Sequence, residues 1–172
     1  MKFLSKNVEE TAEIATNFVK AMLDNPNFEK NRATIVGLYG ELGSGKTTFM
    51  KYLAKAFGIE ETIQSPTYVI MKVYDLVKKP EDAKFSISET CSAAFENFAP
   101  SGFRRIIHID AYRIEKEEEM LNLGWQEIIS DSKNLICIEW PERIKGIMPY
   151  HTVIKFEHAG ENERKIRIEN NL

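Results

Sequence analysis

The sequence predicts an α/β fold in which a mainly parallel central sheet lies between flanking helices. Two observations support this prediction. Apolar, strand-like runs alternate with helical patterns along the chain, and the run ATIVGLY at 33–39 leads directly into a glycine-rich loop and then a helix. A continuous apolar run of this kind is typical of a strand buried on both faces. With 172 residues and no internal repeat, residues 1–172 are expected to form one domain.

Residue patterns place the individual helices and strands. A first helix is expected from Asn7 to Met22, because Asn7 and Glu10 form a capping pair and one face is apolar. That face comprises Val8, Ala12, Ala15, Phe18, Val19 and Met22. A second helix is expected from Lys46 to Phe57, followed by Gly58 at the position of a C-terminal cap. Later strands are expected at 68–74, 105–110, 135–139, 152–156 and 165–169.

The last of these strands alternates charged and apolar residues. This pattern is typical of an edge strand or of a strand with one solvated face. The sequence at 165–169 does not distinguish between the two.

Charge and composition disfavour several classes of function. The formal net charge of -3 and the pI of about 5.7 give no overall positive field, so direct binding of DNA or RNA is disfavoured. Cys91 and Cys137 lie far apart, which predicts neither a metal site nor a disulfide framework. The charged start MKFLSKNVEE does not fit a signal peptide, and no run reaches membrane-spanning length. A cytoplasmic protein with no membrane partner is therefore expected.

The stretch GELGSGKTTF at 40–49 indicates the chemistry. Its spacing Gly-x-x-x-x-Gly-Lys-Thr matches the phosphate-loop pattern, and it lies between a predicted strand and a predicted helix. The glycines let backbone N–H groups point inward, and the helix adds the positive end of its dipole, which favours a triphosphate. Lys46 is expected to reach the β and γ phosphates, Thr47 to bind Mg²⁺ through its hydroxyl, and Thr48 to add a phosphate hydrogen bond.

This loop makes the predicted fold more specific, namely a three-layer P-loop NTPase-like fold. The residues predicted to bind the nucleotide are Glu41, Leu42, Gly43, Ser44, Gly45, Lys46, Thr47 and Thr48.

Two acidic residues end predicted strands, Asp110 in IIHID and Glu139 in LICIE. A phosphate loop needs an acid on a neighbouring strand to complete the metal shell. Both side chains are expected at the carboxyl edge of the sheet, where ligands bind in open α/β folds. The sequence leaves the division of roles between them open.

Absent motifs narrow the class of nucleotide-binding protein. The guanine-reading Asn-Lys-x-Asp loop of GTPases does not occur, and Asp110 is followed by AYR rather than by x-x-Gly. The Leu-Ser-Gly-Gly signature of ABC-type ATPases is also missing. Motor and AAA-type ATPases commonly place Glu beside the strand-end Asp, and that feature is absent too.

Taken together, the motifs resemble the TsaE family of bacterial ATPases. In order, they are GELGSGKTTF, SPTY (65–68), HIDAYR (108–113), LGWQEII (123–129) and IEWPER (138–143), and they cover nearly the whole chain. The resemblance implies that the chain binds ATP and Mg²⁺ and supports the formation of threonylcarbamoyl-adenosine beside the anticodon of tRNAs that read ANN codons. It also implies that the ATPase acts with the TsaD and TsaB proteins. Because the net charge of the chain is -3, tRNA is expected to reach it indirectly, through that complex.

The resemblance also implies roles for individual residues. Thr47 and Glu139 become the protein ligands of Mg²⁺, and Lys46 a phosphate-binding catalytic residue. Asp110 either positions the attacking water or is an outer-shell partner of the metal. Thr67 in SPTY resembles a switch residue near the γ phosphate, with an ordinary Ser-Pro turn as the alternative.

Other residues near these motifs have two interpretations each. Trp140 either covers the site or packs under the turn at Pro141. Arg113 and Arg143 either offset charge in the transition state or pair with the acidic run EKEEE at 115–119. Adenine is the expected base, with contacts near the start of the first helix around Val8.

The segment 77–104 is longer than expected for the family. It contains KKPEDAK, which reads as a loop, and then a pattern that predicts a short helix in which Cys91, Phe95 and Phe98 share a face. We interpret it either as a lineage-specific surface insertion or as a lid or partner-binding element. Two other functions remain open from the residues alone, a small-molecule or nucleoside kinase and a non-catalytic module that binds nucleotide without turnover.

Overall fold

The structure is a computed structural model that describes residues 1–24, 31–59, 61, 63–76 and 102–169. Its centre is a seven-stranded sheet with the strand order β1-β7-β6-β2-β5-β4-β3. The strands are β1 (Lys2–Ser5), β2 (Thr34–Tyr39), β3 (Met71–Asp75), β4 (Arg105–Asp110), β5 (Asn134–Glu139), β6 (Thr152–His158) and β7 (Arg164–Glu169). The helices are α1 (Val8–Leu23), α2 (Lys46–Ala56), α4 (Glu117–Asn122) and α5 (Trp125–Ser130), with a 3-10 turn η1 (Pro141–Ile144).

The sheet is mixed, and its parallel pairs lie at its centre. Strand β2 pairs in parallel with both β5 and β6, and β5 pairs in parallel with β4. Antiparallel pairs join β3 to β4 on one side and β6, β7 and β1 on the other. The carboxyl ends of β2, β4 and β5 therefore meet at one edge, as expected for an open α/β fold.

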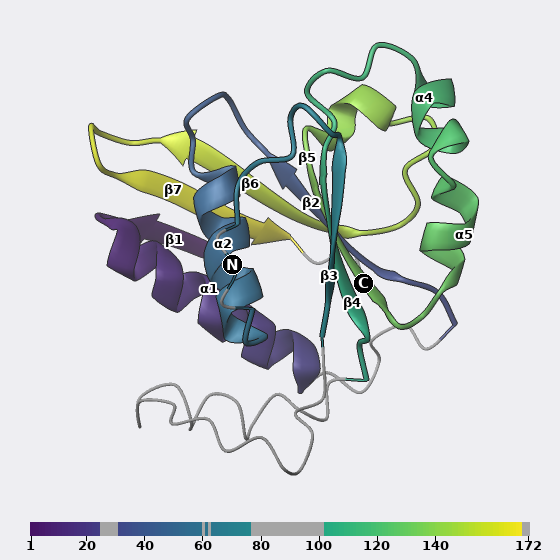
Figure 1. Ribbon diagram of the computed structural model, residues 1–172. Helices are drawn as coiled ribbons and strands as arrows, with labels where there is room; N and C mark the ends of the chain where they lie inside the picture. Colours follow the sequence, from purple (N-terminus) through teal and green to yellow (C-terminus); the bar gives the residue numbers. More distant parts are fainter. Residues whose placement is uncertain (25–30, 60, 62, 77–101, 170–172) are drawn as a thin grey trace.

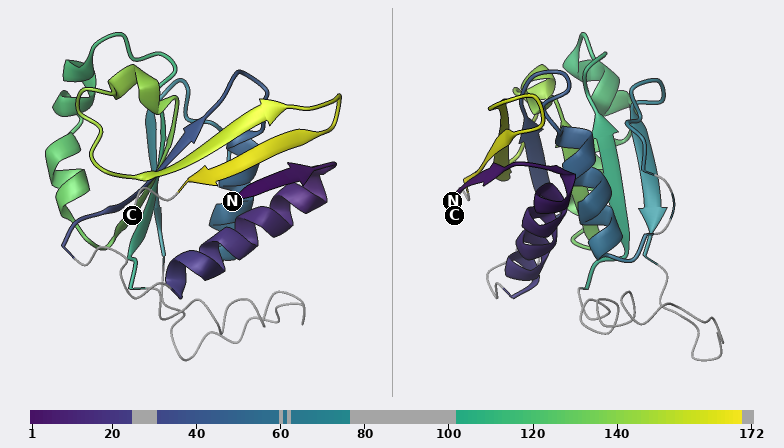
Figure 2. Two further views of the ribbon diagram at one scale, coloured as in Figure 1. Left: turned by 180° about the vertical axis from the view of Figure 1, so that it is seen from behind. Right: turned by 90° about the vertical axis from the view of Figure 1, so that its left-hand side faces the viewer.

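Helices cover both faces of the sheet, so the predicted three-layer α/β fold is confirmed (Figures 1 and 2). Helices α1 and α2 pack on one face, while α4, α5 and η1 lie over the other. The run NLICIE in β5 is almost wholly apolar because both faces of this strand are buried. Leu135 and Cys137 join the core under α1 and α2, while Ile136 and Ile138 join the core under α4 and α5.

Helix α1 begins where the capping pair predicts. The Asn7 side chain accepts a hydrogen bond from the Glu10 amide at 2.8 Å, and Glu10 accepts one from the Lys6 amide at 2.7 Å. Val8 was expected on the buried face but is 50% exposed. The reason is that the packed stripe of α1 starts only at Thr11, whose hydroxyl bonds the buried Ser5 hydroxyl at 2.7 Å.

One strand prediction needs correction, and one open alternative is decided. The strand expected at 68–74 begins only at Met71, because the amides of Val69 and Ile70 turn back to the carbonyl of Pro66 and Ile70 has a left-handed φ of 64°. For the strand at 165–169, the alternative of one solvated face is confirmed, because exposed and buried residues alternate along β7, and the alternative of an edge strand is not. Strand β7 lies between β6 and β1. Three elements of the structure were not predicted, namely β1, α4 and α5.

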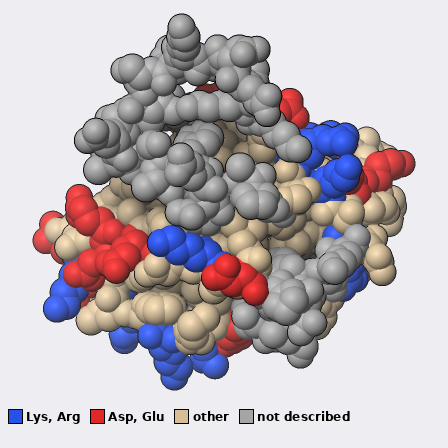
Figure 3. All heavy atoms as spheres, turned by 90° about the horizontal axis from the view of Figure 1, so that it is seen from below, with Lys and Arg blue, Asp and Glu red and all other residues tan. Residues whose placement is uncertain are grey.

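Of the segment 77–104, residues 77–101 lie outside the described residues, so both interpretations of it stay predictions. Within the described ranges, no helix has the length and apolar character needed to cross a membrane. On the face seen in Figure 3, the described basic and acidic side chains are interspersed, which agrees with the small net charge of -3.

Candidate nucleotide site

The loop between β2 and α2 requires its glycines. A Cβ at Gly40 would lie 2.4 Å from the carbonyl oxygen of Phe156 and 2.8 Å from Oγ of Ser44, and Gly40 has a φ of 143°. Gly43 and Gly45 also have positive φ values, 73° and 103°. Side-chain-bearing residues rarely adopt this backbone. The Gly-x-x-Gly-x-Gly spacing therefore follows from the loop geometry.

Lys46 opens α2 and lies inside the loop. Its Nζ donates to the carbonyl oxygens of Gly40 and Glu41 at 2.6 Å and 2.8 Å, and lies 4.0 Å from the centre of the Trp140 ring. Burial lowers the pKa of Lys46, and the nearby carboxylates of Glu139, Glu142 and Asp110 oppose that shift. The side chain is only 4% exposed, so its charge depends on these protein contacts.

Thr47 and Glu139 meet at the start of α2. The Thr47 hydroxyl lies 2.8 Å from Oε1 and 3.0 Å from Oε2 of Glu139. Glu139 reaches this point because β5 is the direct neighbour of β2. Its Oε1 also lies 2.9 Å from Nε2 of His108 on β4, and both side chains are buried. Glu139 is therefore held from two sides.

Asp110 ends β4 and lies opposite Glu139 in the parallel register. Its Oδ2 accepts hydrogen bonds from the hydroxyls of Ser65 and Thr67, which are themselves 2.6 Å apart. Its Oδ1 accepts from the Tyr112 amide at 3.0 Å. The SPTY segment is thus connected to the strand end through Asp110. The structure separates the two acids: Glu139 contacts the phosphate loop, and Asp110 contacts SPTY.

Trp140 follows Glu139 in a left-handed conformation with a φ of 59°. Its ring lies over Lys46 and 5.1 Å from the Tyr112 ring, so Trp140 covers the lysine. Arg113 and Arg143 lie over the rings of Tyr68 and Tyr112, at 4.3 Å and 5.9 Å. Among the ion pairs formed by described residues, neither arginine pairs with the acidic run at 115–119.

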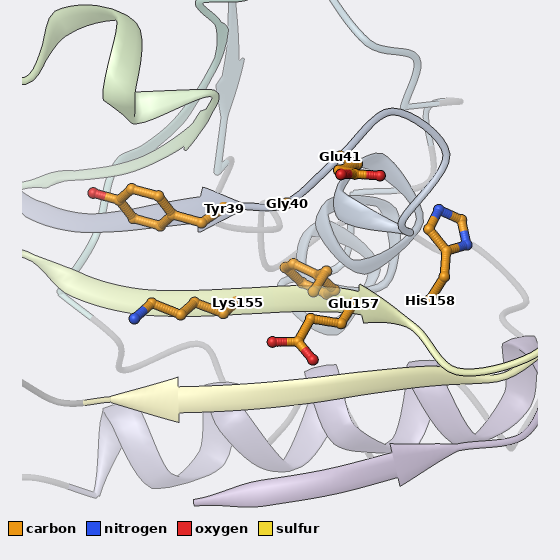
Figure 4. A pocket seen from close by; sticks show the side chains of 7 residues that line it. Tyr39, Gly40, Glu41, Lys155, Glu157 and His158 are labelled. Carbon is orange, nitrogen blue, oxygen red and sulfur yellow. The ribbon is translucent and has the colours of Figure 1, made fainter.

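The β6–β7 side supports the outer part of the loop. Nε2 of His158 lies 3.4 Å from the Leu42 carbonyl oxygen, and Arg164 donates to the Gly43 carbonyl oxygen at 3.3 Å. A pocket of about 440 Å³ lies between the carboxyl ends of β2 and β6, beside the loop. Figure 4 shows the side chains that line it. Its lining residues are Tyr39, Gly40, Glu41, Lys155, Phe156, Glu157 and His158.

Four residues of this site received no role from the sequence. They are Ser65, His108, His158 and Arg164. Two of them have a local signal: Ser65 is the first residue of the motif SPTY, and His108 is the first residue of HIDAYR and a polar residue inside the apolar strand RIIHID. The other two, His158 and Arg164, contact the site through tertiary packing.

Thr47 and Glu139 together suit a hard divalent cation. A hydroxyl oxygen and a carboxylate lie together, and Mg²⁺ prefers oxygen ligands. In the described part of the chain, no group of three or more His, Cys, Asp or Glu side chains is arranged to hold a metal. Mg²⁺ in nucleotide sites usually has one or two protein ligands and takes the rest from phosphates and water, so these two residues fit.

Comparison with known proteins identifies the family. The family described as "Threonylcarbamoyl adenosine biosynthesis protein TsaE" matches residues 5–166. The TsaE protein of Treponema pallidum is 28% identical over 169 residues, covering 98% of this chain and 99% of that protein. The TsaE protein of Rickettsia felis is 32% identical over 160 residues, covering 92% and 73%.

The fold has a counterpart among solved structures. The crystal structure of Bacillus subtilis YdiB matches with a TM-score of 0.63 and 24% identity, over 98% of this chain and 83% of that chain. The family and the phosphate-loop fold together indicate nucleotide binding. The chain belongs to the TsaE family of threonylcarbamoyl adenosine biosynthesis proteins.

Proposed function

We propose that this chain binds ATP with Mg²⁺ at the loop 40–47 and hydrolyses it slowly, in support of threonylcarbamoylation of the tRNA adenosine next to the anticodon. The partners we propose are TsaD and TsaB, which would bring the tRNA. One observation carries the proposal: the Thr47 hydroxyl lies on both carboxylate oxygens of Glu139, at the start of the helix that follows the phosphate loop.

The loop and Lys46 would bind the phosphates. The loop leads directly into α2, which begins at Lys46, and the N-terminal end of a helix favours anions. Lys46 would exchange its contacts with the Gly40 and Glu41 carbonyls for contacts with the β and γ phosphates. Thr47 and Glu139 would hold Mg²⁺. When bound, that ion neutralises charge on the phosphate oxygens.

Asp110 and Thr67 would act on the attacking water. Asp110 accepts two hydroxyl hydrogen bonds and one amide hydrogen bond, so its carboxylate is held in one orientation. Because Glu139 rather than Asp110 contacts Thr47, we assign the metal role to Glu139 and the water-positioning role to Asp110. Thr67 bonds Asp110 and is followed directly by Tyr68, which is 85% exposed. Through Thr67, the presence of ATP in the site would therefore change the exposed surface of SPTY.

The test compares Glu139→Gln with Glu127→Gln. Glu127 is an exposed carboxylate on α5, on the other face of the sheet from α2, and serves as the matched control. ATP affinity is measured by calorimetry in EDTA and in MgCl₂. Glu139→Gln should weaken binding in MgCl₂ more than in EDTA, because it replaces an anionic oxygen ligand with a neutral one. Equal effects under the two conditions would contradict a metal role for Glu139.

A further inference from the structure

His108 is the buried group at this site that the proposed function leaves without a role. It lies inside strand β4, and its side chain is fully buried. The neighbours Ile106, Ile107 and Ile109 are all apolar. Burying a polar ring among apolar side chains is costly unless it forms a hydrogen bond. Among the described residues, one hydrogen bond reaches the His108 ring, and it joins Nε2 to Oε1 of Glu139 at 2.9 Å.

The geometry assigns the position of the imidazole proton. Nδ1 of His108 is buried and has no hydrogen-bond partner among the described residues. A carboxylate oxygen only accepts hydrogen bonds, so the nitrogen that faces Glu139 carries the proton. An N–H at Nδ1 would be a buried donor without an acceptor. Nε2–H therefore donates to Glu139, and Nδ1 carries no proton.

The two oxygens of Glu139 are consequently not equivalent. Thr47 has a single hydroxyl proton, and its oxygen lies at similar distances, 2.8 Å and 3.0 Å, from Oε1 and Oε2. Thr47 alone does not distinguish them. The His108 contact reaches Oε1 only, so it fixes the rotation of the carboxylate and leaves Oε2 with fewer partners.

We propose that His108 is a positioning residue that holds Oε1 of Glu139 and thereby presents Oε2 to the Mg²⁺ site. This inference rests on the proposed function, because it requires Glu139 to bind the metal. Groups that hydrogen-bond a metal ligand typically change metal affinity or activity about 10- to 100-fold when they are removed.

A matched pair of variants separates this role from simple packing. In His108→Gln the side-chain amide stands near the place of Nε2 and still reaches Glu139, whereas in His108→Asn it stands near Nδ1 and does not. Both variants are polar and occupy the same buried position. Ile106→Val, two residues earlier on the same face of β4, is the control for a small packing change.

The first measurement is the affinity for a non-hydrolysable ATP analogue, by calorimetry in EDTA and across a MgCl₂ series. His108→Asn should lose about 10-fold or more of the Mg²⁺-dependent gain in affinity. His108→Gln and Ile106→Val should keep most of that gain, and all variants should match the wild type in EDTA. Wild-type Mg²⁺ dependence in His108→Asn, or equal losses in the Asn and Gln variants, would overturn the proposal.

The second measurement needs neither metal nor a variant of His108. Nitrogen NMR of histidine-labelled protein reports the tautomer, and the chain has only three histidines to assign. We expect the Nε2–H form for His108, with a signal that moves in Glu139→Gln. An Nδ1–H form would overturn the proposal even if His108→Asn failed to fold. If Glu139→Gln does not alter Mg²⁺ dependence, the proposed metal site itself fails. If Glu139→Gln acts and His108→Asn does not, only the positioning role fails.

Discussion

The ammonium of Lys46 lies over the face of the Trp140 ring, 4.0 Å from its centre. Trp140 directly follows Glu139 in the sequence. The face of an indole ring attracts a cation, and the carbonyls of Gly40 and Glu41 complete the contacts of this ammonium. The charge of Lys46 is thus satisfied by the protein alone. Phosphate binding has to replace these contacts, so the net effect of Lys46 on affinity is a difference between two bonded states.

Lys46→Met should therefore weaken ATP binding without unfolding the protein. Hydrogen bonds to charged groups contribute about 1.5 to 3 kcal/mol each, and the loss should be reduced by the carbonyl contacts that the wild type gives up. Calorimetry at fixed MgCl₂ measures the change in ATP affinity. Lys51→Met, an exposed position on the same helix, is the control. Unchanged affinity in Lys46→Met would refute the phosphate-loop assignment.

The lowered pKa of Lys46 predicts a pH dependence of stability in the absence of nucleotide. Burial is the main cause of the shift from 10.5. Below the folded-state pKa, both folded and unfolded chains hold the proton. Between that pKa and 10.5 the unfolded chain binds more protons, so stability should rise with pH in this window and level off above it.

Urea unfolding of the wild type and of Lys46→Met, from neutral pH to above 10.5, checks this. The free energy of unfolding of the wild type, minus that of the variant, should increase as pH rises through this window. A difference that stays constant or falls with pH would contradict the direction of the shift.

Gly40 should not tolerate a side chain. Its Cβ would lie 2.4 Å from the Phe156 carbonyl oxygen, a backbone atom of β6, and its φ is 143°. Gly40→Ala should lower the free energy of unfolding by about 2 kcal/mol or more, because both strain and a clash arise. At Gly160 the nearest atom is 3.4 Å away on the Glu163 side chain, so Gly160→Ala should change it by less than about 1 kcal/mol. Chemical denaturation of both variants makes the comparison, and similar losses would argue against the clash.

The loop was predictable because its requirements are local. Gly40, Lys46 and Thr47 are fixed by spacing within one strand–loop–helix unit, and the strand ends at Asp110 and Glu139 follow from apolar runs. Which acid faces Thr47 depends on the order of strands in the sheet. Strand β5 is next to β2, while β4 is one strand further away. Tertiary packing sets that order, and neither apolar run, IIHID or LICIE, predicts it.

Two causes explain the missed strand β1 and the missed turn before β3. Strand β1 has only four residues and exists through its pairing with β7, at the other end of the chain. The turn before β3 forms because the Pro66 carbonyl accepts from the amides of Val69 and Ile70, which otherwise read as strand residues. Sequence periodicity detects neither kind of long-range or turn-specific contact.

Thr67 should matter more for turnover than for binding. Its hydroxyl bonds Asp110 and Ser65 and makes none of the observed contacts to the phosphate loop. Thr67→Ala should therefore reduce partner-stimulated ATP turnover more than ATP affinity, and Thr67→Ser, which keeps the hydroxyl, should restore turnover. Steady-state ATPase assays and calorimetry on the same preparations compare the two effects. Equal losses in turnover and affinity would argue for a plain binding role.

The isolated chain should hydrolyse ATP slowly, and TsaD with TsaB should accelerate it. Asp110 is followed by Ala111 rather than by a glutamate that would activate water. Arg113 lies on the Tyr68 ring and Arg143 on the Tyr112 ring. Arg164 does contact the phosphate loop, but its hydrogen bonds to described residues all go to backbone carbonyls, that of Gly43 among them. Phosphoryl transfer depends on positioning and charge stabilisation, and a group supplied by a partner changes the rate by about 10³ to 10⁵ in other systems.

Steady-state ATPase of the purified chain is to be measured alone, with cognate TsaD and TsaB, and with tRNA. We expect stimulation by the two proteins and none by tRNA alone, because the net charge of -3 provides no field that would capture tRNA directly. Glu139→Gln should remove the stimulated rate, and Glu127→Gln should retain it. Fast turnover without partners would contradict this prediction, and transfer of the γ phosphate to a nucleoside or metabolite would favour a kinase instead.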